Sequence, residues 1–362
     1  MTPQQTPPPT AGLTAVVVAC AALGMVAVGA AVYGVPGLGS GPLARASSAT
    51  PESDAAGSPA PAATPSTSAA SAGTAPSSST SSRTTPDFAT EDYGRRLVAH
   101  TAELLGPDHP EPGRRFIDSR LNCGSCHLAT GTEPGTLNLL QTDEHYPRFS
   151  GRAGTMTDIE DRINECMTRS MNGRPLPMDS PEMIAMATYL RSLGARWSAM
   201  GDSLRASAEP PAFKTPNRRA DVALGQLVYS TRCAACHGAD GLGLPASTDL
   251  RKGYLFPPLW GPDSFNNGAG MHRVLTAARF IKARMPLGEP TLSDDEAFDV
   301  AAFINSKPRP EMAHLDVDYP DRSAKPIDNP YGPYADDFPL DQHRFGPFQP
   351  IEEYYRALKA SK

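Results

Sequence analysis

Two copies of the motif C-x-x-C-H constrain the fold of this chain of 362 residues more than any other feature. At this spacing, two thiols can form thioethers with the vinyl groups of a haem, and the following histidine can bind the iron. A redox dithiol or half of a zinc site also uses C-x-x-C, but two copies that each end in His favour haem. We therefore expect two covalently bound haem c groups. The expected attachment and iron-binding residues are Cys123, Cys126 and His127 in the first copy and Cys233, Cys236 and His237 in the second.

The two motifs lie in similar surroundings, which indicates an internal duplication and a mainly α fold. Residues 220–232 carry the apolar spacing of a helix that leads into the second motif. A helix that begins at Ser180 follows the first motif, and another that begins at Ser293 follows the second. We therefore expect two cytochrome c-type haem domains, the first over residues 87–206 and the second over residues 207–307.

The N-terminal 86 residues differ in composition from the rest of the chain. Ala11 to Val35 contains no charged residue and exceeds the roughly 20 residues that cross a bilayer. We expect residues 1–35 to be a membrane anchor or a signal segment, and we favour the anchor because the first ten residues contain no Lys or Arg. In residues 36–86, 45 of 51 are Ser, Thr, Ala, Pro or Gly, which predicts a disordered linker. Either alternative places the haem domains on the extracytoplasmic, periplasmic side of the cell membrane.

The formal net charge is −6, which argues against nucleic acid as a partner because nucleic-acid binders carry basic patches.

Residues 308–362 are rich in proline, aspartate and aromatic residues. We expect this segment to be an irregular tail that wraps over both haem domains.

The ligand on the far side of each iron sets its chemistry. Met285 follows His237 by 48 residues and precedes Pro286, a position typical of the thioether ligand in electron-transfer cytochromes. We therefore expect Met285 to bind the second iron. The other candidates in the second domain are Met271, His272 and Lys282.

In the first domain, Cys166 is the notable candidate because it has no cysteine partner outside the expected anchor. The spacing predicts a helix with Thr157 as its N-cap and Gly173 at its end. On this helix Arg162 and Arg169 flank Cys166, and arginines hold a sulfur in its thiolate form. The alternative ligands are Met167, Met171 and Met178.

Several segments carry a resemblance to a known family. They are INEC at 163–166, RSMNG at 169–173, GAGMHR at 268–273, FIKARMPLG at 280–288, KPID at 325–328, PYGPY at 330–334 and GPF at 346–348. With them, residues 93–351 resemble the dihaem thiosulfate dehydrogenases. The first domain of that family is similar to the haem subunit of the Sox thiosulfate-oxidising complex.

The resemblance implies an enzyme that joins two thiosulfates into tetrathionate and releases two electrons, a reaction that some relatives favour in reverse. The implied iron ligands are His127 and Cys166 for the first, catalytic haem and His237 and Met285 for the second, electron-transferring haem. Arg152 and Arg162 match arginines near the substrate. The membrane tether suggests an electron acceptor on the membrane side, such as a small cytochrome c or a terminal oxidase.

One position departs from part of that family. Some relatives carry a lysine directly before the methionine that can bind the second iron, whereas this chain has Arg284. Arginine stays protonated and cannot bind iron, so we expect stable coordination by His237 and Met285 unless Lys282 takes that role.

Two functions other than thiosulfate oxidation are also considered. One is a Sox-type haem subunit that transfers thiosulfate to a carrier cysteine, and the other is a non-catalytic, membrane-tethered dihaem electron carrier.

Overall fold

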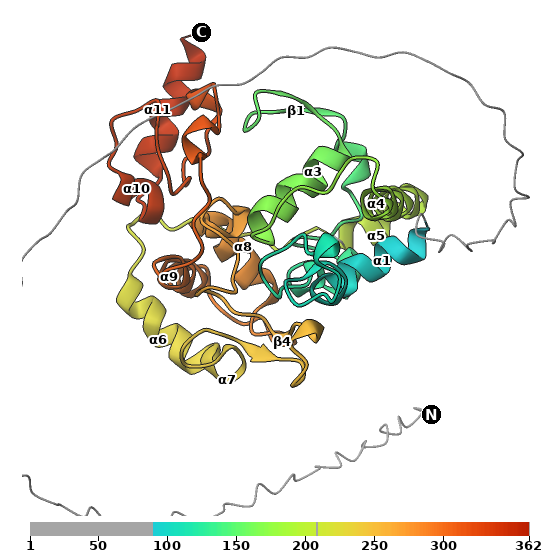
Figure 1. Cartoon of the computed structure of the whole chain (residues 1–362). Helices are drawn as coiled ribbons and strands as arrows, with labels where there is room; N and C mark the ends of the chain where they lie inside the picture. Colours follow the sequence, from blue (N-terminus) through green and yellow to red (C-terminus); the bar gives the residue numbers. More distant parts are fainter. Residues whose placement is uncertain (1–89, 208, 362) are drawn as a thin grey trace, which may run out of the picture. The chain divides into compact units, whose positions relative to one another are not determined.

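The computed structural model describes residues 90–207 and 209–361 (Figure 1). The predicted anchor or signal segment over residues 1–35 and the predicted linker over residues 36–86 lie outside the described residues. Within the described ranges, no helix combines the length and the apolar character needed to cross a bilayer. The described part is mainly helical, as predicted, with two short antiparallel hairpins.

The first haem motif lies among five helices and one hairpin. The elements are α1 (Glu91–Ala99), α2 (Thr101–Leu105), β1 (Arg148–Ser150), β2 (Thr155–Thr157), α3 (Ile159–Glu165), α4 (Pro181–Ala199) and α5 (Asp202–Ser207). The predicted N-cap Ser180 is confirmed, since its side chain accepts a hydrogen bond from the backbone N–H of Met183. Helix α1 was not predicted from the sequence.

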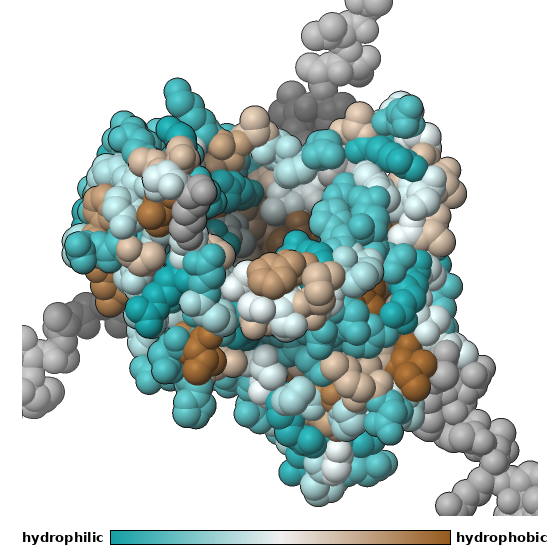
Figure 2. Space-filling model, turned by 90° about the horizontal axis from the view of Figure 1, so that it is seen from above, coloured by the Kyte–Doolittle hydropathy of each residue, from teal (hydrophilic) through white to brown (hydrophobic). Residues whose placement is uncertain are grey.

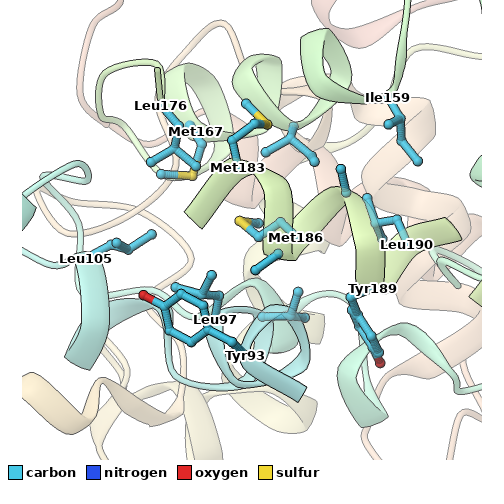
Figure 3. Packing of buried hydrophobic residues seen from close by; sticks show 14 of the residues in the cluster. Tyr93, Leu97, Leu105, Ile159, Met167, Leu176, Met183, Met186, Tyr189 and Leu190 are labelled. Carbon is cyan, nitrogen blue, oxygen red and sulfur yellow. The ribbon is translucent and has the colours of Figure 1, made fainter. Parts of the chain in front are cut away.

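Helices α1 and α4 cross at a glycine and form the core of this region. A Cβ atom at Gly94 would collide with the carbonyl oxygen of Ala185, so only glycine allows this close crossing. Figure 3 shows side chains of α1 packed against side chains of α4 in this core. The labelled members of these two helices are Tyr93, Leu97, Met183, Met186, Tyr189 and Leu190.

The second haem motif lies in a region that repeats this arrangement. Its elements are α6 (Val222–Arg232), α7 (Ala234–His237), β3 (Leu244–Pro245), β4 (Tyr254–Phe256), α8 (Val274–Arg284) and α9 (Asp294–Asn305). Helices α6 and α9 cross at Gly225, where a Cβ atom would collide with the carbonyl oxygen of Asp299. The predicted N-cap Ser293 is confirmed, with Glu296 closing a capping box.

Short 3-10 turns connect these helices and strands. They are Pro112–Arg114, Cys123–Ser125, Ala129–Gly131, Asp143–His145, Leu250–Lys252, Gly270–His272, Leu315–Val317 and Arg322–Ala324.

The C-terminal tail contacts both haem-motif regions. Tyr319 donates its backbone N–H to the carbonyl oxygen of Arg152, and a carboxylate oxygen of Asp328 accepts from the backbone N–H of Leu275 at 3.0 Å in the first turn of α8. The tail is less irregular than predicted, because it contains α10 (Leu340–Phe345) and α11 (Gln349–Ala360). A buried contact of 3.0 Å between His343 and Asp336 helps to order this part.

Candidate haem and substrate site

Both motif histidines are held in the same way. Nδ1 of His127 lies 2.7 Å from the carbonyl oxygen of Leu137, and Nδ1 of His237 lies 2.8 Å from that of Pro257. Because a carbonyl oxygen only accepts, Nδ1 is the protonated nitrogen in each ring, and Nε2 is left to bind iron. Burial lowers the pKa of both histidines, which favours the neutral form that binds metal. These surroundings fit two haems.

Three of the four motif thiols have raised rather than lowered pKa values. Burial raises the pKa of Cys123 to about 12 and the pKa values of Cys126 and Cys233 to about 11. Reactive dithiols and thiolate metal ligands have lowered pKa values instead. This environment argues against the redox-dithiol interpretation and is compatible with thioether attachment, which leaves no thiol to ionise. Cys236 is exposed, so the second motif reaches the surface.

Cys166 begins a π-helical turn directly after α3. The turn covers Cys166–Ser170, and the backbone N–H of Met171 donates to the carbonyl oxygen of Cys166 at 3.0 Å. Such wide turns are rare and occur frequently at functional sites. The Cys166 thiol is close enough to Cys123 and Cys126 to raise the pKa of each. The fold therefore brings Cys166 to the first haem motif from a distant part of the sequence.

The predicted ends of the helix that presents Cys166 are wrong. The N-cap is Asp158 rather than Thr157, because Asp158 and Asp161 exchange side-chain-to-backbone hydrogen bonds of 2.9 and 3.0 Å. A carboxylate forms a charge-assisted cap and therefore outcompetes a neighbouring hydroxyl. The predicted terminator Gly173 lies beyond the π turn and pairs with Ile117 in an isolated β-bridge.

Three methionines of this region are the alternatives to Cys166 as the ligand of the first iron, and each makes its own contacts with the protein. Met167 and Met171 are buried in the hydrophobic core of the first region. Met178 is half exposed, and its sulfur lies 3.8 Å from the side-chain nitrogen of Asn164. Cys166 remains our candidate for the first iron, with these methionines as its alternatives.

Arg162 lies beside Cys166, and Glu165 joins Arg162 to a second arginine, Arg152. The interaction with Cys166 is the largest cause that raises the pKa of Arg162. Nη1 of Arg162 donates to Oε2 of Glu165 at 3.0 Å, and Nη1 of Arg152 lies 3.8 Å from the same oxygen. Glu165 was missed in the sequence, although its spacing of three residues from Arg162 on a helix was a usable signal. The structure thus links Arg162 to Cys166, and it brings Arg152 and Arg162 to the same carboxylate oxygen of Glu165.

Arg169 does not take the role that the sequence predicted for it. Its side chain is buried, and Nη2 donates to a carboxylate oxygen of Asp318 at 2.8 Å. Tyr331 donates to the other oxygen of Asp318 at 2.7 Å. Because Asp318 neutralises its charge, Arg169 is engaged with the tail rather than with the Cys166 sulfur. The pair holds the tail against the segment that carries Cys166.

A hollow of about 410 Å³ lies beside the hairpin β1–β2 and α3. Its lining includes Asp161, Asn164, Glu165 and Thr168, whose spacing places them on one face of the helical segment. Cys166 is not among its lining residues, whereas the neighbouring Glu165 is. Figure 2 shows a largely hydrophilic face of the molecule that is hollowed near its middle.

Met285 lies at the C-cap of α8. It is partly buried and packs against the hydrophobic core of the second haem-motif region, as Met271 also does. The Nζ of Lys282 donates to the carbonyl oxygen of Leu292 at 2.7 Å and lies 3.6 Å from Asp294. His272 is in hydrogen-bond contact with the main chain of Asn267 at 2.9 Å, and burial lowers its pKa to about 4. Lys282 and His272 thus have protein partners of their own.

Comparison with known proteins identifies a cytochrome c domain around each haem motif. Residues 118–196 match the family described as SoxA/TsdA, cytochrome c domain, and residues 220–304 match that described as cytochrome C oxidase, cbb3-type, subunit III. Two cytochrome c domains imply c-type haems and an extracytoplasmic location.

Individual relatives agree with the family matches. The chain is 41% identical over 224 residues to thiosulfate dehydrogenase of Allochromatium vinosum, which covers 60% of this chain and 77% of the relative. It is 40% identical over 230 residues to thiosulfate dehydrogenase of Stutzerimonas stutzeri, with coverage of 63% and 72%. Among solved structures, it resembles thiosulfate dehydrogenase (TsdBA) from Marichromatium purpuratum in its as-isolated form. The TM-score is 0.54 at 33% identity, over 62% of this chain and 47% of that chain. By its two cytochrome c domains and its identity to these relatives, the chain belongs to the thiosulfate dehydrogenase family.

Proposed function

We propose that this protein joins two thiosulfate ions into tetrathionate beside the first haem motif, where Cys166, Arg152 and Arg162 meet. The placement of Cys166 carries this proposal. Its thiol interacts with both motif cysteines of the first region and with the guanidinium group of Arg162. His127 and Cys166 would hold the first haem, and His237 and Met285 would hold the second.

The two arginines address the main electrostatic obstacle. Two thiosulfate dianions repel each other with four times the Coulomb energy of two unit charges at the same distance. Arg162, which interacts with Cys166, and Arg152, which approaches the neighbouring Glu165, supply two positive charges and lower this repulsion. Both guanidinium groups approach Glu165, so a bound thiosulfate must replace the carboxylate as their partner. Glu165 therefore acts as an internal competitor of the substrate.

The reaction releases two electrons for each tetrathionate formed, and the haems supply one-electron acceptors for them. A thiolate ligand lowers the potential of a haem iron, whereas a thioether raises it. The ligand pairs that we propose therefore favour electron flow from the first region to the second. The exposed Cys236 places the second motif at the surface, where a small cytochrome c or a terminal oxidase can accept the electrons.

The domain assignments form part of the proposal. The first cytochrome c domain covers residues 87–206, the second covers residues 207–307, and the tail covers residues 308–362. Residues 1–35 would anchor the enzyme to the membrane, and residues 36–86 would connect that anchor to the haem domains on the periplasmic side.

The test compares the full-length holoprotein with its Cys166→Gly and Met178→Leu variants. The oxidised wild type and Met178→Leu should give a low-spin electron paramagnetic resonance signal typical of His/thiolate ligation. Cys166→Gly should lose this signal and its thiosulfate oxidation while it keeps both haems attached. Met178 is a suitable control because it is a rival sulfur that is half exposed.

Turnover by the purified protein with a small electron acceptor separates the alternatives. A Sox-type transferase needs a carrier protein, and a tethered electron carrier does not react with thiosulfate. Full activity of Cys166→Gly, or the same resonance signal in it, would refute the role of Cys166.

A further inference from the structure

Arg284, directly before Met285, reaches across to the first haem region. Its Nη1 donates to a carboxylate oxygen of Glu133 at 3.3 Å, and its Nη2 donates to the carbonyl oxygens of Glu133 and Pro134. The Arg284 side chain is only 13% exposed, although its Glu133 partner is 47% exposed. A contact this well covered, between residues about 150 positions apart, fixes two distant segments against each other.

The loop that receives Arg284 is shaped for it. Gly135 has φ +97°, a conformation that favours glycine, and a Cβ atom there would lie 3.1 Å from Nη2 of Arg284. The loop is closed by a hydrogen bond of 2.7 Å from the backbone N–H of Leu139 to the carbonyl oxygen of Gly131. Neither the close approach of Gly135 to Arg284 nor the hydrogen bond between Leu139 and Gly131 involves the exposed carboxylate of Glu133.

The same loop orients His127. Two residues after Gly135 comes Leu137, whose carbonyl oxygen accepts from Nδ1 of His127 at 2.7 Å. A continuous path therefore runs from Met285 through Arg284 and the 131–139 loop to His127. Its two ends are the residues that we propose as ligands of the two irons.

We propose that Arg284 is a positioning residue that fixes the His127 loop against the Met285 end of α8 and thereby sets the rate of electron transfer between the two haems. This inference rests on the proposed function only in its choice of His127 and Met285 as iron ligands. A guanidinium suits the task because its planar fork can contact two carbonyl oxygens and a carboxylate at once, whereas an ammonium is a point charge. The arginine that cannot replace Met285 on the iron thus has a separate role in this chain.

The test uses the full-length holoprotein and variants on both sides of the contact. Arg284→Met removes the fork, and Gly135→Ala disturbs the loop that receives it. Arg356→Met is the matched control, since the side chain of Arg356 is 70% exposed and bonds Glu352 within one helix. Glu133→Gln removes the exposed carboxylate and should change little, because exposed ion pairs contribute little.

Two readouts are measured, and neither needs thiosulfate. The first is the rate at which electrons equilibrate between the haems after rapid photoreduction, followed by absorbance. The second is amide hydrogen exchange in residues 131–139. Arg284→Met and Gly135→Ala should slow equilibration by roughly three- to tenfold and increase exchange in the loop. Both should keep the wild-type resonance signals of the two irons.

An unchanged equilibration rate in both variants would overturn the proposal. Loss of the His/Met signal in Arg284→Met would also overturn it, because Arg284 would then support a ligand rather than position the loop. The wild-type spectrum and the activity of Cys166→Gly test the proposed function separately, so the two failures are distinguishable.

Discussion

Glu165 offers the sharpest test of the substrate site. Its carboxylate lies 3.0 Å from Nη1 of Arg162 and 3.8 Å from Nη1 of Arg152, and we propose that it competes there with an incoming dianion. Glu165→Gln keeps the size of the side chain and removes its charge. A carboxylate about 5 Å from a dianion in a medium as polar as water repels it by about 1.7 kcal/mol. Removing that repulsion should therefore lower the KM for thiosulfate by roughly 15- to 20-fold.

The assay is steady-state thiosulfate oxidation by the purified holoprotein with a small electron acceptor, at several salt concentrations. The fall in KM should shrink as salt increases, because screening weakens interactions between exposed charges. Glu160→Gln is a suitable control, since Glu160 lies on the same helix and pairs with Arg191 at 2.7 Å. An unchanged or higher KM in Glu165→Gln, with both haems attached, would refute the assignment of Arg152 and Arg162 to the substrate.

Two further predictions concern stability. Asp318→Asn leaves Arg169 buried without its counter-charge and should lower the free energy of unfolding by about 3 kcal/mol in chemical denaturation. Asp92→Asn, in an exposed pair with Arg95, should lower it far less, and equal effects of the two variants would contradict the reasoning. Burial and the neighbouring Glu182 raise the pKa of Tyr93 to about 12 from the ordinary value of 10.0. The unfolded chain therefore loses this proton first, and stability should fall as pH rises from 10 to 12. Tyr93→Phe should flatten that fall, and an identical pH profile would argue against it.

Local features were predictable from the sequence, and long-range partners were not. The caps Ser180 and Ser293 could be identified because a capping hydrogen bond spans only a few residues. Thr157 and Asp158 are adjacent capping residues, and the choice between them depended on Asp161 completing the capping box. Arg169 was assigned to Cys166 because the two are close on a helix, yet Asp318 lies 149 residues away and pairs with it. No periodicity or composition links such positions.

The charge balance of the site also bears on the release of product. The chain carries a net charge of −6, so a dianion is attracted only where positive charge is concentrated locally. Asp318 neutralises Arg169, which leaves Arg152 and Arg162 against the single charge of Glu165. Four negative charges enter with two thiosulfates, and two leave on one tetrathionate after two electrons are removed. Since tetrathionate is still a dianion, arginines without a competing carboxylate would retain it. Glu165→Gln should therefore also strengthen inhibition by tetrathionate by roughly the same factor as it lowers the KM. A lower KM without stronger product inhibition would mean that Glu165 affects the entry of thiosulfate alone.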